Sequence, residues 1–283
     1  MCISRNTMEY RNIVAILVIV FYSIAFILAS LLVWRHGFKT SWETWLLLAT
    51  FSLSRIVYGS LQVSTIADPD SIGLRVAAAI WAVDGLAGLY FCSLGLLKGV
   101  LERLEKLELQ TRVRPFHLRL CEALVTAAFI CASIGYSGLS DEDVMFGMRG
   151  HPATSQAAAV MYIVALAIGI ACTGAMLVHY RQLCRLDQRI LLILVASQPL
   201  LAVRVIYLSL DILGNARMFS VIRGSVTAFL LMALLMEAIV LAAFLGLGYT
   251  FPVVREEAKE ADEHGLPQKL DSTDGVWRQT SRC

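Results

Sequence analysis

The chain has 283 residues, of which 58% are hydrophobic and only 16% are charged. Soluble domains carry about 25% charged residues, so this composition excludes an ordinary soluble protein and indicates a surface that faces membrane lipid. The formal net charge is +2, and the basic residues are scattered between apolar runs. This pattern excludes a nucleic-acid-binding protein.

Seven apolar runs are long enough to cross the roughly 30 Å of hydrocarbon in a bilayer. None of them alternates between polar and apolar residues as a barrel strand would, so each is expected to be a helix. The first run is too long for the apolar part of a cleavable signal peptide. The runs cover residues 12–34, 45–66, 73–97, 120–136, 157–179, 190–212 and 226–249.

The seven runs divide the chain into three predicted parts. Residues 1–11 form a short N-terminal segment, residues 12–250 form one all-α transmembrane bundle, and residues 251–283 form a polar tail that is expected to be disordered. The chain has 24 Lys and Arg residues. Of these, 16 lie on one side of the membrane, in segments 35–44, 98–119 and 180–189 and in the tail. The positive-inside rule therefore predicts a non-cytoplasmic N-terminus and a cytosolic C-terminus.

A short sequence pattern occurs in both span two and span six. Residues 55–61 and 204–210 share the order Arg, two β-branched residues, Tyr, any residue, Ser and Leu. Both spans run in the same direction in the predicted topology, so the match suggests two parallel three-helix units joined by span four, an arrangement known in some transporters. The alternative is a chance match, because aliphatic residues are common in membrane spans.

Four ionisable residues lie near the middle of their spans: Arg55, Asp84, Arg204 and Glu237. A charge at the bilayer midplane costs at least about 2.5 to 3.5 kcal/mol unless it is compensated. We therefore expect all four side chains to face the interior of the bundle, with Arg55 pairing with Asp84 and Arg204 pairing with Glu237.

On spans two and six, further polar residues lie at helical spacing from the arginines, so they are expected to face the interior of the bundle as well. Tyr58 and Tyr207 follow their arginines by three residues, and Trp81 precedes Asp84 by three, so these aromatic side chains are candidates for lining a cavity. The alternative is that the polar contacts only hold the helices together. The stripes expected to face inward are Ser52, Arg55, Gly59 and Gln62 on span two, and Ser197, Arg204 and Asp211 on span six.

The sequence lacks the residues that several classes of membrane protein need for their function. The spans contain no aspartate-rich motifs for magnesium and diphosphate, and the last span contains no lysine for a retinal Schiff base. The histidines are isolated from one another, so we expect no metal site and no cofactor, and each histidine is interpreted as a loop or interface residue. They are His36, His117, His151, His179 and His264.

The stretches 51–55 and 198–207, together with Met236 and Glu237, resemble a family of fungal seven-helix membrane proteins that is largely uncharacterised. The resemblance covers most of residues 12–250 and implies a fungal source and a multi-pass membrane bundle. The number of helices and the intramembrane carboxyl groups are also similar to those of fungal membrane-bound terpene cyclases, which work without metal. That second likeness is one of architecture only.

These features lead to a functional hypothesis in fungal secondary metabolism, at the endoplasmic reticulum rather than the plasma membrane. The bundle would hold a lipophilic, isoprenoid-like intermediate, and Asp84 and Glu237 would supply proton transfer in a terpenoid cyclase or isomerase. Glu237, which has no polar neighbour at helical spacing, is the candidate for the neutral, proton-donating carboxyl. Arg55 and Arg204 would keep the two carboxyl groups in different protonation states. The alternatives are a non-catalytic transporter or seven-helix sensor for a lipophilic molecule, and a structural membrane subunit without a ligand.

Overall fold

The computed structural model describes residues 2–36, 44–68, 71–106, 113–139, 151–214, 217–221 and 224–250, with side chains from residue 10 onward. Within these ranges the chain is helical and contains no strand. Seven helical segments are long and apolar enough to cross a membrane. The protein is therefore an integral, multi-pass membrane protein in contact with lipid, as the composition predicted.

The helices follow the seven predicted runs closely. The last span is divided into α9 (Val226–Phe229), a π-helical segment η3 (Leu230–Leu235) and α10 (Met236–Thr250). Two short 3₁₀ turns, η1 (Tyr180–Gln182) and η2 (Arg217–Phe219), precede spans six and seven. The other spans are α1 (Cys2–His36), α3 (Trp45–Ser64), α4 (Ile72–Lys106), α5 (Pro115–Ser137), α7 (Ala153–Leu177) and α8 (Arg185–Ile212).

The sequence accounts for where several of these helices begin. Pro115 occupies the first position of α5, where its missing N–H group costs nothing and its fixed backbone angle favours a helix. Ser225 caps α9 through its side chain, which accepts a hydrogen bond from the N–H of Ala228. These helix-start residues therefore lie close to the ends of the apolar runs, where the spans were predicted to begin.

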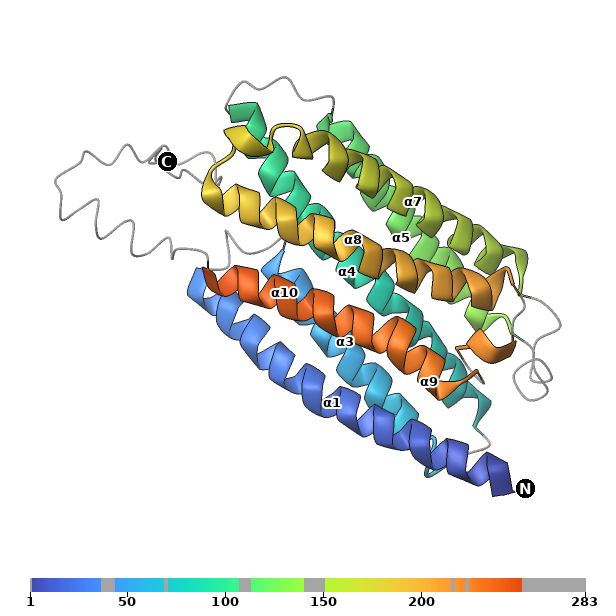
Figure 1. Cartoon of the computed structure of the whole chain (residues 1–283). Helices are drawn as coiled ribbons and strands as arrows, with labels where there is room; N and C mark the ends of the chain where they lie inside the picture. Colours follow the sequence, from blue (N-terminus) through green and yellow to red (C-terminus); the bar gives the residue numbers. More distant parts are fainter. Residues whose placement is uncertain are drawn as a thin grey trace.

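The central helix of the bundle is α4 (Figure 1). It packs against α3, α5, α8 and α10, while α1 covers α3 and α10, and α7 covers α5 and α8. In its most apolar stretch 67% of the residues of α4 are buried, against 33% for α1, α5 and α7. Side chains of α4 consequently contact both halves of the bundle.

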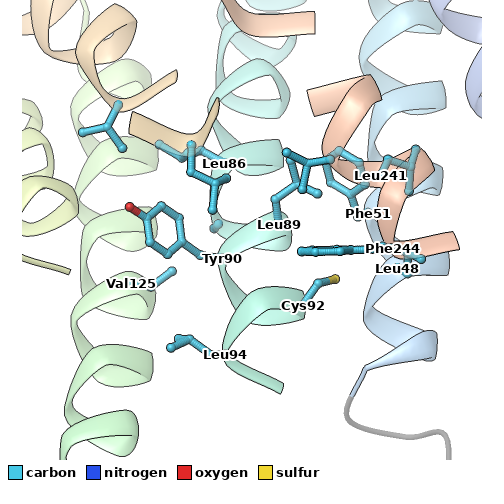
Figure 2. Close-up of a cluster of buried hydrophobic side chains, with 14 of the residues drawn as sticks. Leu48, Phe51, Leu86, Leu89, Tyr90, Cys92, Leu94, Val125, Leu241 and Phe244 are labelled. Atoms are coloured by element: carbon cyan, nitrogen blue, oxygen red, sulfur yellow. The ribbon is translucent and has the colours of Figure 1, made fainter. Parts of the chain in front are cut away.

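Apolar packing around α4 is shown in Figure 2. On one side, Leu89 lies near Phe51 of α3 and Phe244 of α10, and on the other side Tyr90 faces Val125 of α5. All five side chains are buried. Residues on the outer face of α1 are exposed instead, as expected for a helix surface covered by lipid tails.

The inward-facing stripes of spans two and six are confirmed. Ser52, Arg55 and Gly59 on α3 are buried, Gln62 is half-buried, and the three predicted residues of α8 are also buried. Helices α3 and α8 run in the same direction (Figure 1). The repeat of three-helix units, the non-cytoplasmic N-terminus and the cytosolic C-terminus all stay predictions. The tail that was predicted to be disordered lies outside the described residues.

Candidate functional site

A buried group of three charged residues, in which one carboxylate pairs with two arginines, lies in the interior of the bundle where three helices meet around α4. Arg55 comes from α3, Arg204 from α8 and Glu237 from the first turn of α10. The relative exposure of these residues is 0%, 1% and 1%. We call this set the midplane cluster, because each residue lies near the middle of its span.

A single carboxylate oxygen of Glu237 accepts from both arginines. Arg55 Nη2 donates to Glu237 Oε1 over 2.8 Å, and Arg204 Nε donates to the same oxygen over 2.8 Å. Hydrogen bonds between ionised partners are stronger than neutral ones, and the low dielectric of the interior strengthens them further. Glu237 therefore compensates the charge of one guanidinium and shares its oxygen with the second.

Helix α4 supplies the other acceptor for the two arginines, a backbone carbonyl. Arg204 Nη2 donates to the carbonyl oxygen of Ala82 over 2.8 Å, and both terminal nitrogens of Arg55 donate to the same oxygen over 3.1 Å. Arg55 Nη1 also reaches the carbonyl oxygen of Trp81 at 3.3 Å. The cluster thus connects four spans through one turn of α4.

Gly85 makes the path of Arg55 across α4 possible. A Cβ atom built at this position would overlap the guanidinium group of Arg55. The guanidinium lies where any larger residue would place its side chain, so only glycine fits here.

The predicted pairing of Arg204 with Glu237 is confirmed, but the pairing of Arg55 with Asp84 is wrong. Arg55 passes over Gly85 and reaches Glu237 instead. Among the described residues, Asp84 forms an ion pair with neither arginine. It is half-buried and lies near Ser54, whose hydroxyl donates to the carbonyl oxygen of Phe51 over 2.8 Å. The two carboxyl groups therefore occupy different surroundings.

The tyrosines of the repeated pattern converge on the same span as the arginines do. The rings of Tyr58 and Tyr207 lie 5.7 Å and 6.1 Å from the ring of Phe229, which precedes Glu237 by two helical turns. The guanidinium carbons of Arg55 and Arg204 lie 6.0 Å and 5.6 Å from the rings of their own tyrosines, close enough for cation–π attraction. The Arg and Tyr residues that spans two and six share thus all contact the last span.

Trp81 lies apart from these aromatic residues. Its relative exposure is 36%, so its indole reaches the lipid-facing surface of α4 while its carbonyl oxygen accepts from Arg55. The neighbouring Asp84 is also incompletely buried. Two residues of α4 that adjoin the cluster in sequence are thus incompletely buried.

Several buried polar atoms in and around the cluster have no hydrogen-bond partner within the part of the chain that the structure describes. They are Arg55 Nε, Arg204 Nη1 and Glu237 Oε2, together with the hydroxyl groups of Tyr22 and Tyr207. Tyr22 is 2% exposed and lies within electrostatic reach of all three residues of the cluster. Buried polar groups are normally hydrogen-bonded, so these atoms are available to form hydrogen bonds with a bound molecule.

Both helices that carry the Arg204–Glu237 pair are locally irregular. Pro199 lies inside α8, five residues before Arg204, and the π-helical segment η3 ends directly before α10, which carries Glu237. A proline removes one backbone hydrogen bond and bends a helix, and π-helical turns occur frequently at functional sites. The pair is therefore held by two helices whose backbone hydrogen bonding departs from that of a regular α-helix.

A second buried polar cluster, which the sequence did not reveal, lies around Asp211 in the last turn of α8. Tyr136 of α5 donates to Asp211 Oδ2 over 2.7 Å, and His151 Nε2 lies 3.5 Å from Asp211 Oδ1. The backbone N–H of Val221 also donates to Asp211 Oδ2 over 3.4 Å. His151 was expected at a loop or interface, and its burial could not be predicted because its partner lies 60 residues further along the chain. Asp211 itself followed the predicted stripe.

Among the described residues, no group of three or more histidine, cysteine, aspartate or glutamate side chains could hold a metal ion. The midplane cluster and its neighbouring tyrosines present guanidinium, carboxylate and phenol groups.

Comparison with known proteins gives one match. A family model described as "Domain of unknown function (DUF7702)" matches residues 8–254, which includes all seven spans. No curated protein and no solved structure matches the chain.

Proposed function

The chain belongs to this DUF7702 family, whose function is unknown, and we propose from the midplane cluster that it binds a lipophilic small molecule between its helices, as a transporter or sensor. The molecule would enter from the membrane and place a polar group against Arg55, Arg204 and Glu237. This proposal is the non-catalytic alternative that the sequence left open, and the geometry favours it over proton transfer by Glu237.

The observation that carries the proposal is the incomplete hydrogen bonding of a fully buried ion pair. Polar contacts that only hold helices together stabilise a bundle best when every donor and acceptor is paired. Here Arg55 Nε, Arg204 Nη1 and Glu237 Oε2 all lack a partner. Leaving a buried polar atom unpaired costs about 1 to 3 kcal/mol, so a ligand that pairs these atoms gains binding energy from them.

The same geometry argues against Glu237 as the proton donor of an enzyme. Its Oε1 atom accepts hydrogen bonds from two guanidinium groups. That oxygen is therefore already engaged by both arginines. Glu237 is better suited to orient the arginines than to protonate an alkene.

Photoaffinity labelling tests the binding proposal. Purified protein in lipid nanodiscs would be labelled with diazirine analogues of palmitic acid, palmityl alcohol and farnesol, and the labelled peptides identified by mass spectrometry. We expect at least one probe to label peptides of α3, α4, α8 or α10 saturably, with loss of label when the unmodified compound is added. Labelling restricted to lipid-exposed residues such as Val20 and Ile24 of α1, without saturation, would contradict the proposal.

A second candidate function is acid–base catalysis on an isoprenoid by a metal-independent cyclase or isomerase of the endoplasmic reticulum. It is favoured by one observation, the presence of two carboxyl groups in different surroundings. Glu237 is fully buried and bound to both arginines, whereas Asp84 is half-buried and outside the ion pair. Two carboxyl groups in contrasting environments can divide the roles of acid and base.

Metabolite profiling of the native host separates the two functions. If the protein is an enzyme, Asp84→Asn and deletion of the gene should accumulate the same lipophilic precursor at matched protein level. If the protein only binds its ligand, Asp84→Asn should leave no such precursor. Asp68→Asn is the matched control, because Asp68 is an exposed acid just before α4 and should change neither profile.

A further inference from the structure

The chemistry of the unpaired atoms specifies the head group of the ligand. Arg55 Nε and Arg204 Nη1 are donors that cannot accept a hydrogen bond, while Glu237 Oε2 is an acceptor. The Tyr22 and Tyr207 hydroxyls add two further groups that can donate. Donors therefore outnumber acceptors in the interior, and a ligand that fills the site must bring acceptor atoms.

The charge of the midplane cluster points in the same direction. Two guanidinium groups share one carboxylate oxygen, so the ion pair carries an excess of one positive charge. Arg11 of α1 adds a further positive charge, since it lies within electrostatic reach of Tyr58 and Tyr207 while donating to the carbonyl oxygen of Gly224 over 3.0 Å. When it is ionised, Asp84 opposes this excess from outside the ion pair. An excess positive charge in a low dielectric favours an anion.

Apolar residues lie next to the cluster on the same helices. Phe51 precedes Arg55 by one turn of α3, Leu89 follows Gly85 by one turn of α4, and Leu241 follows Glu237 by one turn of α10 (Figure 2). The guanidinium carbon of Arg55 lies 5.6 Å from the Phe51 ring. A molecule with its head group at the arginines would thus have hydrocarbon surroundings for its chain.

We infer that the ligand of the midplane cluster is an amphiphile with a carboxylate head, bound by Arg55 and Arg204 with support from the Tyr22 hydroxyl. The inference rests on the proposed binding function and specifies its ligand class. Guanidinium groups match the planar geometry of a carboxylate, and the two oxygens of the head would pair donors that Glu237 leaves unpaired.

Competition against photolabelling measures the head-group preference. Palmitate, methyl palmitate, palmityl alcohol and hexadecylamine share one chain length and differ in charge and hydrogen bonding. We expect palmitate to compete about tenfold more strongly than the ester and the alcohol, because charge-assisted hydrogen bonds are roughly twice as strong as neutral ones. Hexadecylamine should compete most weakly, since its ammonium group meets an excess of positive charge.

Two conservative variants test the named groups without removing the ion pair. Tyr22→Phe deletes a hydroxyl that has no partner, so the fold should be kept while palmitate binding weakens about fivefold. Asp84→Asn removes the opposing charge and should strengthen palmitate binding about threefold, with no change for the alcohol. Tyr10→Phe is the control for the first variant, because Tyr10 lies on the same helix and is 44% exposed.

The outcomes distinguish this inference from the proposed function. Saturable binding with equal competition by acid, ester and alcohol would overturn the carboxylate head and keep the binding function. Stronger competition by hexadecylamine, or an unchanged palmitate affinity in both Tyr22→Phe and Asp84→Asn, would also overturn it. Failure of every probe to bind saturably would instead overturn the proposed function itself.

Discussion

Replacing Glu237 with alanine should destabilise the bundle by about 3 to 5 kcal/mol, the cost of removing one partner from a buried ion pair. The change leaves the guanidinium groups of Arg55 and Arg204 in an apolar interior without their shared anionic partner. Glu237→Gln should cost less, because its amide oxygen still accepts the two hydrogen bonds although the charge is lost. Reversible unfolding in mixed detergent micelles measures both changes.

Glu105→Ala serves as the control for this series. Glu105 is an exposed acid near the end of α4, so its removal should change the free energy of unfolding by less than about 0.5 kcal/mol. A Glu237→Ala protein as stable as the control would show that the ion pair contributes nothing to the fold. It would also mean that the arginines find other partners, which the described geometry does not offer.

Replacing Gly85 with alanine should destabilise the protein by about 3 kcal/mol, although the change adds a single methyl group. The new Cβ atom would occupy the position of the Arg55 guanidinium, which must then leave both Glu237 and the Ala82 carbonyl. Alanine otherwise favours a helix over glycine by about 1 kcal/mol, so a loss of stability requires this steric cause. Thermal unfolding followed by circular dichroism measures the effect.

The same helix offers a matched control in Gly99→Ala. A Cβ atom at Gly99 meets no other atom within 4 Å, so this variant should be as stable as the parent or slightly more stable. Combining Gly85→Ala with Arg55→Met tests the cause, because a shorter, uncharged side chain at position 55 removes the overlap. If Gly85→Ala costs the same in both backgrounds, the clash with Arg55 is not the reason for the loss.

Much of this architecture could be predicted from local patterns. Apolar runs located all seven spans, because a backbone in lipid must satisfy its own hydrogen bonds and therefore forms helices. The cost of charge at the midplane predicted that Arg55, Asp84, Arg204 and Glu237 would meet in the interior, and three of these four residues do so. Polar residues at helical spacing on spans two and six predicted which faces of these helices turn inward.

The choice of partners could not be predicted in the same way. Asp84 is as close to the midplane in sequence terms as Glu237, and the rotation of α4 decides that it stays half-buried beside Ser54. Gly85 and the carbonyl of Ala82 carry no charge and gave no sequence signal for binding arginine. His151 lay outside every apolar run, although it is buried against Asp211.

Local sequence is sufficient to predict the class of protein, the number of spans and the charged residues that belong in the interior, because each depends on the free energy of transferring one segment into lipid. Which of those residues meet depends on how the helices pack, since helix rotation and the steric freedom at Gly85 bring Arg55 and Arg204 to one oxygen of Glu237. Partner choice depends on close packing between helices, and that packing is a property of the assembled bundle.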